Sequence, residues 1–518
     1  MNGNCVKGSD WMKTDTIAAI ATAMSDSGIG IIRVSGENAI EIVSKIYRSK
    51  NRKKCLCDVK THTIHYGFIY DGDILIDEVM VAVLYAPNTY TRENTVEIDC
   101  HGGILVMNQI LDVLLRGGCR LAEPGEFTKR AFLNGRIDLS RAEAVMDIIH
   151  SKNEFALRSS ISQLSGAVTR KVQFLREEIL YEIAYIESAL DDPEHISLDG
   201  YCAKLEKKVK SIKSILKKLI DSADCGKMLK DGINTVIIGK PNVGKSSLLN
   251  FLVGEDRAIV TSVAGTTRDV LEESIKLHGI GLNIMDTAGI HDTDDEVEKI
   301  GVDKARKYAQ NADLILYVVD TSRQLDENDD AIMELSADKN MIVLLNKSDL
   351  EQIVNAEEVL KKLTHMSENK SNKLTCVSEI NPEKLTHMSD CNQKIQGENK
   401  KTDTCVITEK NRKIRIISTS IKENIGLDKL EEVIKEMFFG GEIFINDELY
   451  ITNQRHKEAF LEAYESMEMV QESLVKEMPE DFYSIDLMSA YTSLGKIIGE
   501  EVGEDLINEI FDKFCMGK

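Results

Sequence analysis

The stretch Gly239-Lys-Pro-Asn-Val-Gly244-Lys245-Ser246 decides the fold of the central part of this chain. It has the spacing of a phosphate-binding loop, and it lies between a predicted strand over 235–239 and a predicted helix over 246–252. The glycines let backbone N–H groups converge on phosphate oxygens, and the N-terminus of the following helix adds positive potential. We expect Lys245 to contact the β- and γ-phosphates and the Ser246 hydroxyl to bind Mg²⁺.

Three further motifs follow in the order that a GTP-binding domain requires: Asp286-Thr287-Ala288-Gly289, Asn346-Lys347-Ser-Asp349 and Ser418-Thr419-Ser420. Asp286 ends a predicted strand and suits a magnesium site, whereas the Asp349 carboxylate can accept both N–H donors of the guanine edge. The serine-rich motif fits a loop that closes over the base. The residues of these motifs that we expect to bind GTP are Asn242, Val243, Gly244, Lys245, Ser246, Ser247, Thr267, Asp286, Thr287, Ala288, Gly289, Asn346, Lys347, Asp349, Ser418, Thr419 and Ser420.

The segment between the phosphate loop and Asp286 contains Gly265-Thr-Thr267-Arg-Asp269. This is the place of a switch segment, and we expect Thr267 to complete the magnesium coordination. Ile290 stands where many GTPases carry a glutamine that orients the attacking water. Because an aliphatic side chain cannot orient water, another group must do so. The nearby acidic candidates are Asp292, Asp294, Asp295, Glu296 and Glu298, most of which we interpret as solvated loop charges. No arginine finger is evident in the sequence, and Arg268 is the nearest candidate for one.

The composition of the chain narrows its class. It has 518 residues, 42% hydrophobic and 29% charged, which is typical of a folded protein of about two to four domains. The formal net charge of −22 disfavours nonspecific coating of nucleic acid, although a local basic site is compatible with it. Eleven scattered cysteines without a secretory leader or transit peptide predict a cytoplasmic protein with reduced thiols. No apolar run reaches membrane-spanning length, so we expect no membrane association.

The pattern predicts a multidomain chain in which an α/β P-loop GTPase domain is inserted into a helical domain. Residues 1–13 are an N-terminal extension, and 14–138 mix short strands with helix signals, as in an α+β domain. Residues 139–228 and 437–518 are the two parts of an α-helical domain. Between them, strands and helices alternate over 229–436, which indicates a doubly wound parallel sheet.

Residues 361–413 stand apart from the rest of the α/β domain. They are rich in lysine, lack aromatic residues and repeat the string Leu-Thr-His-Met-Ser at 363–367 and 385–389. Such a segment cannot bury much of a core, so we predict a disordered surface insertion and favour that over an RNA contact. A predicted helix over 203–223 also carries a lysine-rich face, for which a solvated face is favoured over an RNA contact.

Three longer motifs remain. They are Asp15-Thr-Ile-Ala with Gly28-Ile-Gly-Ile-Ile-Arg33-Val-Ser-Gly36, then Pro124-Gly-Glu-Phe-Thr-Lys-Arg-Ala-Phe-Leu-Asn-Gly135-Arg136, and the terminal Phe514-Cys-Met-Gly-Lys518. Together they resemble the MnmE (TrmE) family of tRNA modification GTPases. The likeness covers nearly the whole chain except the first dozen residues and 361–413. Other translation GTPases share the nucleotide motifs but lack the long middle motif and the C-terminal tag.

The resemblance implies that 14–138 bind folate and form a homodimer, next to a helical domain and an inserted G domain. Members of the family act with an FAD-dependent partner of the MnmG type, as a heterotetramer. Together they add an aminomethyl or carboxymethylaminomethyl group to the wobble uridine of certain tRNAs. A tetrahydrofolate derivative supplies the carbon, and GTP hydrolysis opens and closes the G-domain dimer.

Carried over position by position, the resemblance implies roles for single residues. The positions that match the folate site are Arg33, Glu97, Arg136 and Lys518. The positions that match the potassium site are Asn242, Thr261, Val263 and Thr266, of which Thr261 and Thr266 also belong to the GTP site. Glu298 matches an acid that orients the attacking water through a second water, so it joins Lys245 and Thr267 as a catalytic residue and replaces the missing glutamine.

The chain departs from the family at a few positions. His291 stands where an arginine is common, and Met516 where an isoleucine is usual. Cys515 matches the C-terminal tag and is either a reactive thiol or a small packing group. Cys55-Leu-Cys57, followed by two histidines, fits no standard zinc spacing.

Two other functions compete with a potassium-activated GTPase of tRNA modification. A GTPase switch in ribosome assembly calls for a basic RNA-binding module after the G domain, whereas 437–518 are acidic. A folate-binding scaffold with a vestigial GTPase is disfavoured because Lys245, Ser246, Thr267, Asp286 and Glu298 are intact.

Overall fold

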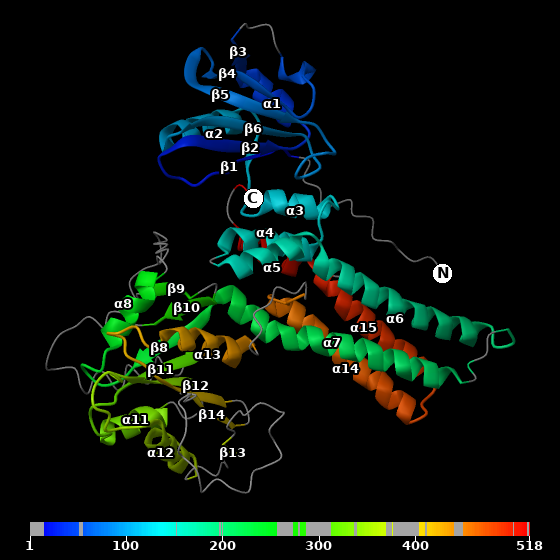
Figure 1. Ribbon diagram of the computed structural model, residues 1–518. Coiled ribbons are helices and arrows are strands. Elements are labelled where there is room, and N and C mark those ends of the chain that lie inside the picture. The colour runs from blue at the N-terminus through cyan, green and yellow to red at the C-terminus, as the bar shows by residue number, and fades with distance from the viewer. Residues whose placement is uncertain are drawn as a thin grey trace. The chain divides into compact units, whose positions relative to one another are not determined.

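The computed structural model in Figure 1 describes residues 15–50, 55–151, 153–195, 198, 200–255, 273–277, 280–285, 312–335, 339–368, 375–376, 404–409, 412–439, 449–500, 502–514 and 517. These residues belong to two compact units. The first takes in the described parts of 1–150, 160–217 and 455–518, and the second those of 151–159 and 218–454.

A seven-stranded sheet opens the first unit, in the order β3-β4-β5-β6-β2-β1-β7. Its strands are β1 Ile17–Ile20, β2 Ser27–Ser35, β3 Tyr47–Ser49, β4 Thr63–Asp71, β5 Ile74–Leu84, β6 Thr95–Gly102 and β7 Arg120–Leu121. Apolar side chains alternate along the strands, so one face is buried under α1 Ala39–Ile46 and α2 Ile104–Arg116 (Figure 1). A short 3₁₀ helix, η1 Leu56–Asp58, packs beside α1. The predicted α+β architecture of this region is confirmed.

Helices of 8 to 31 residues make up the rest of the first unit, and two of them continue along the chain into the second unit. They are α3 Glu126–Leu133, α4 Leu139–His150, α5 Glu154–Leu164, α6 Ala167–Asp191, α7 Tyr201–Asp231, α14 Gln454–Val475, α15 Glu480–Ile498 and α16 Glu504–Asp512. Residues distant in sequence meet here: the guanidinium of Arg176 on α6 lies 4.0 Å from the ring centroid of Tyr491 on α15. The predicted helical architecture is also confirmed.

A buried ionic cluster joins α4 to the start of α14. Arg455 donates two hydrogen bonds to the Glu143 carboxylate, at 2.9 and 2.8 Å, and His456 Nε2 lies 2.9 Å from the same carboxylate. His456 is fully buried. Burial by itself raises the pKa of Glu143, but the charges and hydrogen bonds of His456 and Arg455 outweigh it and lower that pKa from 4.5 to about 2.

This cluster predicts a pH-dependent stability. A carboxyl group whose pKa is lowered in the folded state stabilises that state above its unfolded pKa, and the contribution is lost as the pH falls from about 4.5 towards about 2. We expect the free-energy advantage of the wild type over Glu143→Gln to shrink by about 1 kcal/mol between pH 6 and pH 3.5. Urea unfolding of both proteins, followed by circular dichroism, measures it. An advantage that stays constant over this range contradicts the assignment.

The second unit is built on an eight-stranded sheet in the order β13-β14-β15-β12-β11-β8-β10-β9. The strands are β8 Ile233–Ile238, β9 Glu273–Leu277, β10 Ile280–Ile284, β11 Leu314–Asp320, β12 Asn340–Asn346, β13 Thr375–Cys376, β14 Thr404–Glu409 and β15 Arg412–Ser418. The five strands from β15 to β10 run parallel, and the outer strands pair antiparallel.

Helices cover both faces of this sheet (Figure 1). One apolar core contains residues of α8 Lys245–Glu255 and α13 Leu427–Phe439, and another contains residues near or within α11 Glu327–Leu335 and α12 Ala356–Glu368. The central strands are therefore buried on both sides, which explains the continuous apolar runs of β11 and β12. This is the doubly wound α/β fold predicted from the alternating pattern, and that prediction is confirmed.

Three stretches of the insertion 361–413, which we predicted to be mostly disordered, form regular secondary structure. Helix α12 continues to Glu368, and β13 and β14 extend the sheet beyond β15. The reason lies in local sequence: the run Thr404–Glu409 contains β-branched residues, and it pairs with β15 as an antiparallel hairpin. The other residues of 361–413 lie outside the described part of the chain.

Within the described part of the chain, no helix combines the length and apolar character needed to cross a membrane.

Candidate functional site

The phosphate loop lies at the carboxyl end of β8, directly before α8. Two of its glycines are required by close packing. A Cβ on Gly239 (φ +154°) would lie 2.5 Å from the Val318 carbonyl oxygen, and one on Gly244 (φ +108°) would lie 2.4 Å from the side-chain Nδ2 of Asn346. Asn242 between them also has a positive φ of 62°. The backbone is thus shaped as a loop whose N–H groups can converge on an anion.

Lys245 is folded back onto this loop. Its ammonium group donates to the carbonyl oxygens of Gly239 and Lys240, both at 2.8 Å. Burial lowers the pKa of Lys245, and no carboxylate pairs with it among the described residues. A phosphate group placed in the loop would therefore supply the counter-charge that this cation lacks.

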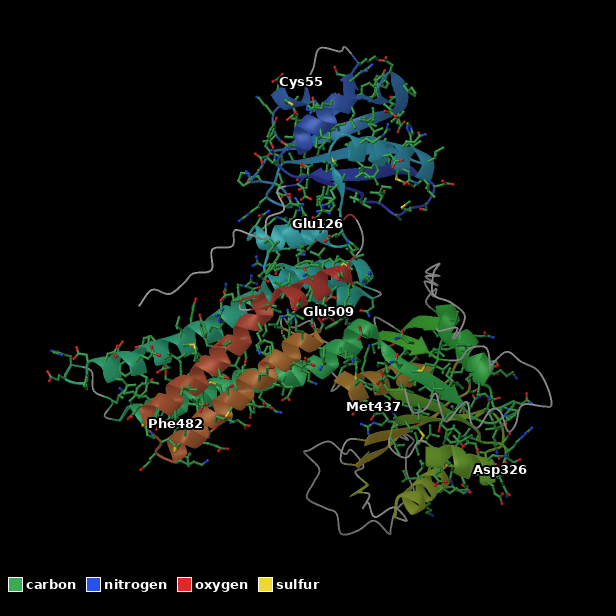
Figure 2. All side chains as sticks on the ribbon, turned by 180° about the vertical axis from the view of Figure 1, so that it is seen from behind. Cys55, Glu126, Asp326, Met437, Phe482 and Glu509 are labelled. Carbon is green, nitrogen blue, oxygen red and sulfur yellow. The ribbon has the colours of Figure 1, made fainter. Side chains whose placement is uncertain are left out.

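Lys240 in the same loop is held differently. Its ammonium group pairs with Asp326 at 2.9 Å and with the buried Asp329 at 2.7 Å, and Tyr317 donates to Asp329 at 2.6 Å. Asp326 precedes α11 and is labelled in Figure 2. These ion pairs, which the motif spacing did not reveal, tie the phosphate loop to the start of α11.

The predicted guanine-binding residues lie beside the phosphate loop. Asn346 donates to the Val243 carbonyl oxygen at 2.7 Å, and Lys347 donates to the Asn242 carbonyl oxygen at 3.0 Å. Lys347 also pairs with Asp320 at 2.6 Å. Sequence reasoning missed Asp320, although a carboxylate at the end of a buried strand is a recognisable signal.

The base-reading carboxylate is fixed by the third motif. Ser420 donates a hydrogen bond to Asp349 at 2.6 Å, and this bond lowers the pKa of Asp349. The Thr419 backbone N–H bonds to the Leu345 carbonyl oxygen at 2.8 Å and Ser348 N–H to the Thr419 carbonyl oxygen at 3.1 Å. The structure thus brings together loops that are more than 70 residues apart. An ionised Asp349 on the exposed side can accept two donors of one base edge.

Several predicted nucleotide-site residues lie outside the described residues. They are Thr261, Val263, Thr266, Thr267, Asp286, Thr287, Ala288, Gly289 and Glu298. The other predicted nucleotide-site residues are described, and they belong to the phosphate loop, to the start of α8 or to the two guanine-side loops. They are Asn242, Val243, Gly244, Lys245, Ser246, Ser247, Asn346, Lys347, Asp349, Ser418, Thr419 and Ser420.

A second group of predicted residues meets in the first unit. Arg33 on β2 lies opposite Glu97 on β6 in the sheet register, and its Nε donates to the Glu97 carboxylate at 2.8 Å. Arg33 also donates to the backbone carbonyl oxygen of Gly517 at 3.2 Å. Gly517 is required there, because a Cβ would lie 2.5 Å from the Ile20 carbonyl oxygen. The neighbouring Lys518 and Cys515 lie outside the described residues.

Arg136 joins this group through an aromatic ring that sequence reasoning missed. The guanidinium carbon of Arg136 lies 4.6 Å from the ring centroid of Tyr90, and that of Arg33 lies 5.6 Å from the same centroid. Arg33 also lies 5.7 Å from the ring centroid of Phe127. Cations, a carboxylate and aromatic faces thus surround one place, a donor set suited to a flat heteroaromatic ligand with an acidic substituent.

A doubly wound sheet has a phosphate loop at its edge, and the Asn346–Asp349 loop is hydrogen-bonded to it. This arrangement is that of a P-loop GTPase. Comparisons with known proteins narrow the class further. The family description "MnmE helical domain" matches residues 139–515, and "GTP-binding protein TrmE N-terminus" matches residues 16–136.

Curated relatives match along almost their entire length. A protein of Lachnoclostridium phytofermentans, named tRNA modification GTPase MnmE, is 50% identical over 507 residues, which cover 98% of this chain and 100% of that protein. Proteins with the same name from Alkaliphilus oremlandii and Clostridioides difficile are each 43% identical, and the matches cover 97% of this chain and 99% of those proteins. The chain therefore belongs to the MnmE family of GTPases.

Proposed function

We propose that this GTPase is activated by potassium and acts with an FAD-dependent partner of the MnmG type. The pair adds a carboxymethylaminomethyl or aminomethyl group to the wobble uridine of certain tRNAs. The observation that carries the proposal is the connected nucleotide site, in which Asn346 and Lys347 hold the phosphate loop while Ser420 holds Asp349. The names of the curated relatives supply tRNA as the substrate class.

In the proposed mechanism, the chain's own residues bind and orient GTP. Asp349 selects guanine, and Lys245 exchanges its two backbone carbonyl partners for the phosphates. Ser246 and Thr267 would hold Mg²⁺, and Glu298 would orient the attacking water through a second water. Potassium, when bound, places positive charge near the leaving phosphate.

Asn242 is the described member of the proposed potassium site. Its positive φ of 62° and the hydrogen bond from Lys347 to its carbonyl oxygen fix the backbone that carries its side-chain amide. An amide oxygen is a hard ligand suited to a monovalent cation. The other proposed ligands, Thr261, Val263 and Thr266, come from the family resemblance.

Potassium dependence is the direct test of this mechanism. At equal ionic strength and saturating GTP and Mg²⁺, replacing K⁺ by Na⁺ is expected to lower the hydrolysis rate about tenfold or more, because charge at the leaving phosphate is lost. The variant Asn242→Gly, which keeps the positive-φ backbone, is expected to lose most of the potassium stimulation while retaining the rate in Na⁺. Equal wild-type rates in the two salts contradict the proposal.

We also propose the family's domain division: residues 14–138 for folate binding and dimerisation, 139–228 and 437–518 for the helical domain, and 229–436 for the G domain. The proposal that a tetrahydrofolate derivative binds here is supported by two contacts: Arg33 pairs with Glu97, and Arg33 and Arg136 both contact the Tyr90 ring. Guanidinium groups suit its carboxylates, and Glu97 suits the donors of its ring. The cytoplasm, where tRNA is available, is the proposed location.

The exposed face of the N-terminal sheet supports a homodimer. Tyr66 on β4 lies directly opposite Met80 on β5, and their side chains are 44% and 48% exposed on the face away from α1 and α2. Ile64, two residues before Tyr66 on the same face, is 62% exposed. A second copy of the same sheet would bury these apolar side chains.

A further inference from the structure

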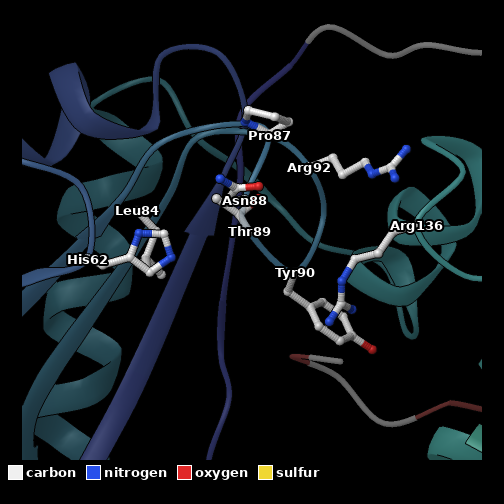
Figure 3. A pocket seen from close by; sticks show the side chains of 8 residues that line it. All are labelled: His62, Leu84, Pro87, Asn88, Thr89, Tyr90, Arg92 and Arg136. Atoms are coloured by element: carbon white, nitrogen blue, oxygen red, sulfur yellow. The ribbon is translucent and has the colours of Figure 1, made fainter. Parts of the chain in front are cut away.

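A cavity of about 500 Å³, shown in Figure 3, is lined in part by Tyr90, whose ring contacts Arg33. The residues that line it are His62, Leu84, Pro87, Asn88, Thr89, Tyr90, Arg92 and Arg136. None of these eight is acidic, and two carry permanently charged guanidinium groups. The chain as a whole has a net charge of −22, whereas the lining of this cavity carries a net positive charge.

The two arginines of the cavity have few partners. Arg92 donates to the Asn134 carbonyl oxygen at 2.8 Å, and within the described part of the chain the Arg136 guanidinium has only its contact with the Tyr90 ring. Arg130 in the same domain is the opposite case, since its guanidinium pairs with Asp15, Glu93 and Glu126. The guanidinium groups of Arg92 and Arg136 therefore retain N–H donors that can bind an anion, whereas the donors of Arg130 are occupied by carboxylates.

The backbone at the cavity is also unusual. His62 and Arg92 both have a φ of 60°, a backbone conformation that residues other than glycine rarely adopt. Such positions persist where the surrounding structure holds them, and they gather at ligand sites. Here both place a nitrogen-bearing side chain at the cavity wall (Figure 3).

The cavity and the proposed folate site share a wall. Tyr90 and Arg136 line the cavity, and the Tyr90 ring also lies under Arg33. A ligand whose ring is held at Arg33 and Glu97 can therefore continue past Tyr90 into the cavity. The volume admits several carboxylate-bearing residues, because drug-sized ligands occupy pockets of about 300–1,000 Å³.

We propose that this cavity binds the γ-linked glutamate tail of a polyglutamylated folate, with Arg92 as the residue that reads the tail. The inference rests on the proposed folate site and extends it to the form of the cofactor. A tail carries one free carboxylate for each added glutamate, and Arg92 lines the cavity, whereas Arg33 is not among the lining residues. Arg136 at the shared wall meets the first carboxylate, and Arg92 meets those that follow. An RNA phosphate is the competing anion, but the cavity adjoins the proposed folate site through Tyr90 and Arg136, which favours the tail of the same ligand.

The test compares two forms of 5-formyltetrahydrofolate, the monoglutamate and the triglutamate, titrated into the full chain by calorimetry. The wild type is expected to bind the triglutamate about tenfold more tightly, as charge-assisted hydrogen bonds from partly exposed arginines give. Arg92→Gln is expected to reduce this ratio to about one while changing the monoglutamate affinity less than about twofold. Arg92→Lys keeps the charge and is expected to restore part of the ratio.

Arg116→Gln is the matched control, because Arg116 is an exposed arginine of the same domain that pairs with Asp71 instead. It is expected to keep the wild-type ratio, and thermal unfolding followed by circular dichroism, with an unchanged transition, shows that each variant is folded. Equal wild-type affinity for both forms overturns the proposal, as does a ratio that survives in Arg92→Gln. Loss of tRNA binding in Arg92→Gln with an unchanged ratio assigns the cavity to RNA. Failure of the wild type to bind either form contradicts the folate site itself, which separates the two claims.

Discussion

Replacing Asp349 by asparagine is expected to lower the affinity for GTP by about two to four orders of magnitude and to create binding of xanthosine triphosphate. Ser420 donates a hydrogen bond to this carboxylate at 2.6 Å, and we propose that the carboxylate accepts two N–H donors of guanine. Hydrogen bonds to a charged group contribute about 1.5–3 kcal/mol each, so losing two costs about 3–6 kcal/mol. Xanthine has a carbonyl where guanine has its amino group, and the asparagine amide can donate to it.

Fluorescent GTP and xanthosine triphosphate analogues, titrated against wild type and variant, measure this change of specificity. Asp330→Asn is the matched control, since Asp330 is an aspartate of the same unit that pairs with Lys362. It is expected to leave both affinities unchanged. An Asp349→Asn protein that keeps wild-type GTP affinity would mean that another group reads the base.

The fold of the second unit could be predicted because its signals are local. The glycine spacing of the phosphate loop and the buried runs of β11 and β12 depend on neighbours in sequence. The contact of Asn346 with Val243 agrees with the rule that parallel strands deliver the loops after them to one edge of the sheet. The hairpin of β14 and β15 was missed because the surrounding composition suggested disorder.

The first unit was harder to predict in detail. Arg33 and Glu97 are neighbours only because β2 and β6 pair in one register, which no pattern in either strand specifies. Tyr90 lies on a loop and carries no motif, so its role as a shared wall required the structure. The cluster of Glu143 with Arg455 and His456 joins positions more than 300 residues apart, beyond any local signal.

The second prediction with a large expected effect concerns Glu298. Changing it to glutamine is expected to lower GTP hydrolysis about a hundredfold, because a carboxylate that orients or accepts a proton from water typically contributes that much. GTP affinity should remain within about threefold, because we propose that Asp349 and Lys245, not Glu298, bind the nucleotide. Stopped-flow binding and phosphate release separate the two quantities. A variant that hydrolyses GTP at the wild-type rate would leave the missing glutamine at position 290 unexplained.

The same variant connects hydrolysis to tRNA chemistry. If turnover drives the modification, Glu298→Gln binds GTP but should fail to support it in cells, whereas the control Asp330→Asn should support it fully. A Glu298→Gln protein that restores the modification would separate the GTPase from the tRNA pathway.

Mass analysis of the wobble nucleosides of tRNA, from cells lacking this chain and from cells in which it is restored, shows whether the chain is needed for wobble uridine modification. We expect aminomethyl and carboxymethylaminomethyl uridine derivatives to disappear without the chain and to return with the wild type. Wobble uridines that are modified equally in the presence and absence of the chain would contradict the proposed function.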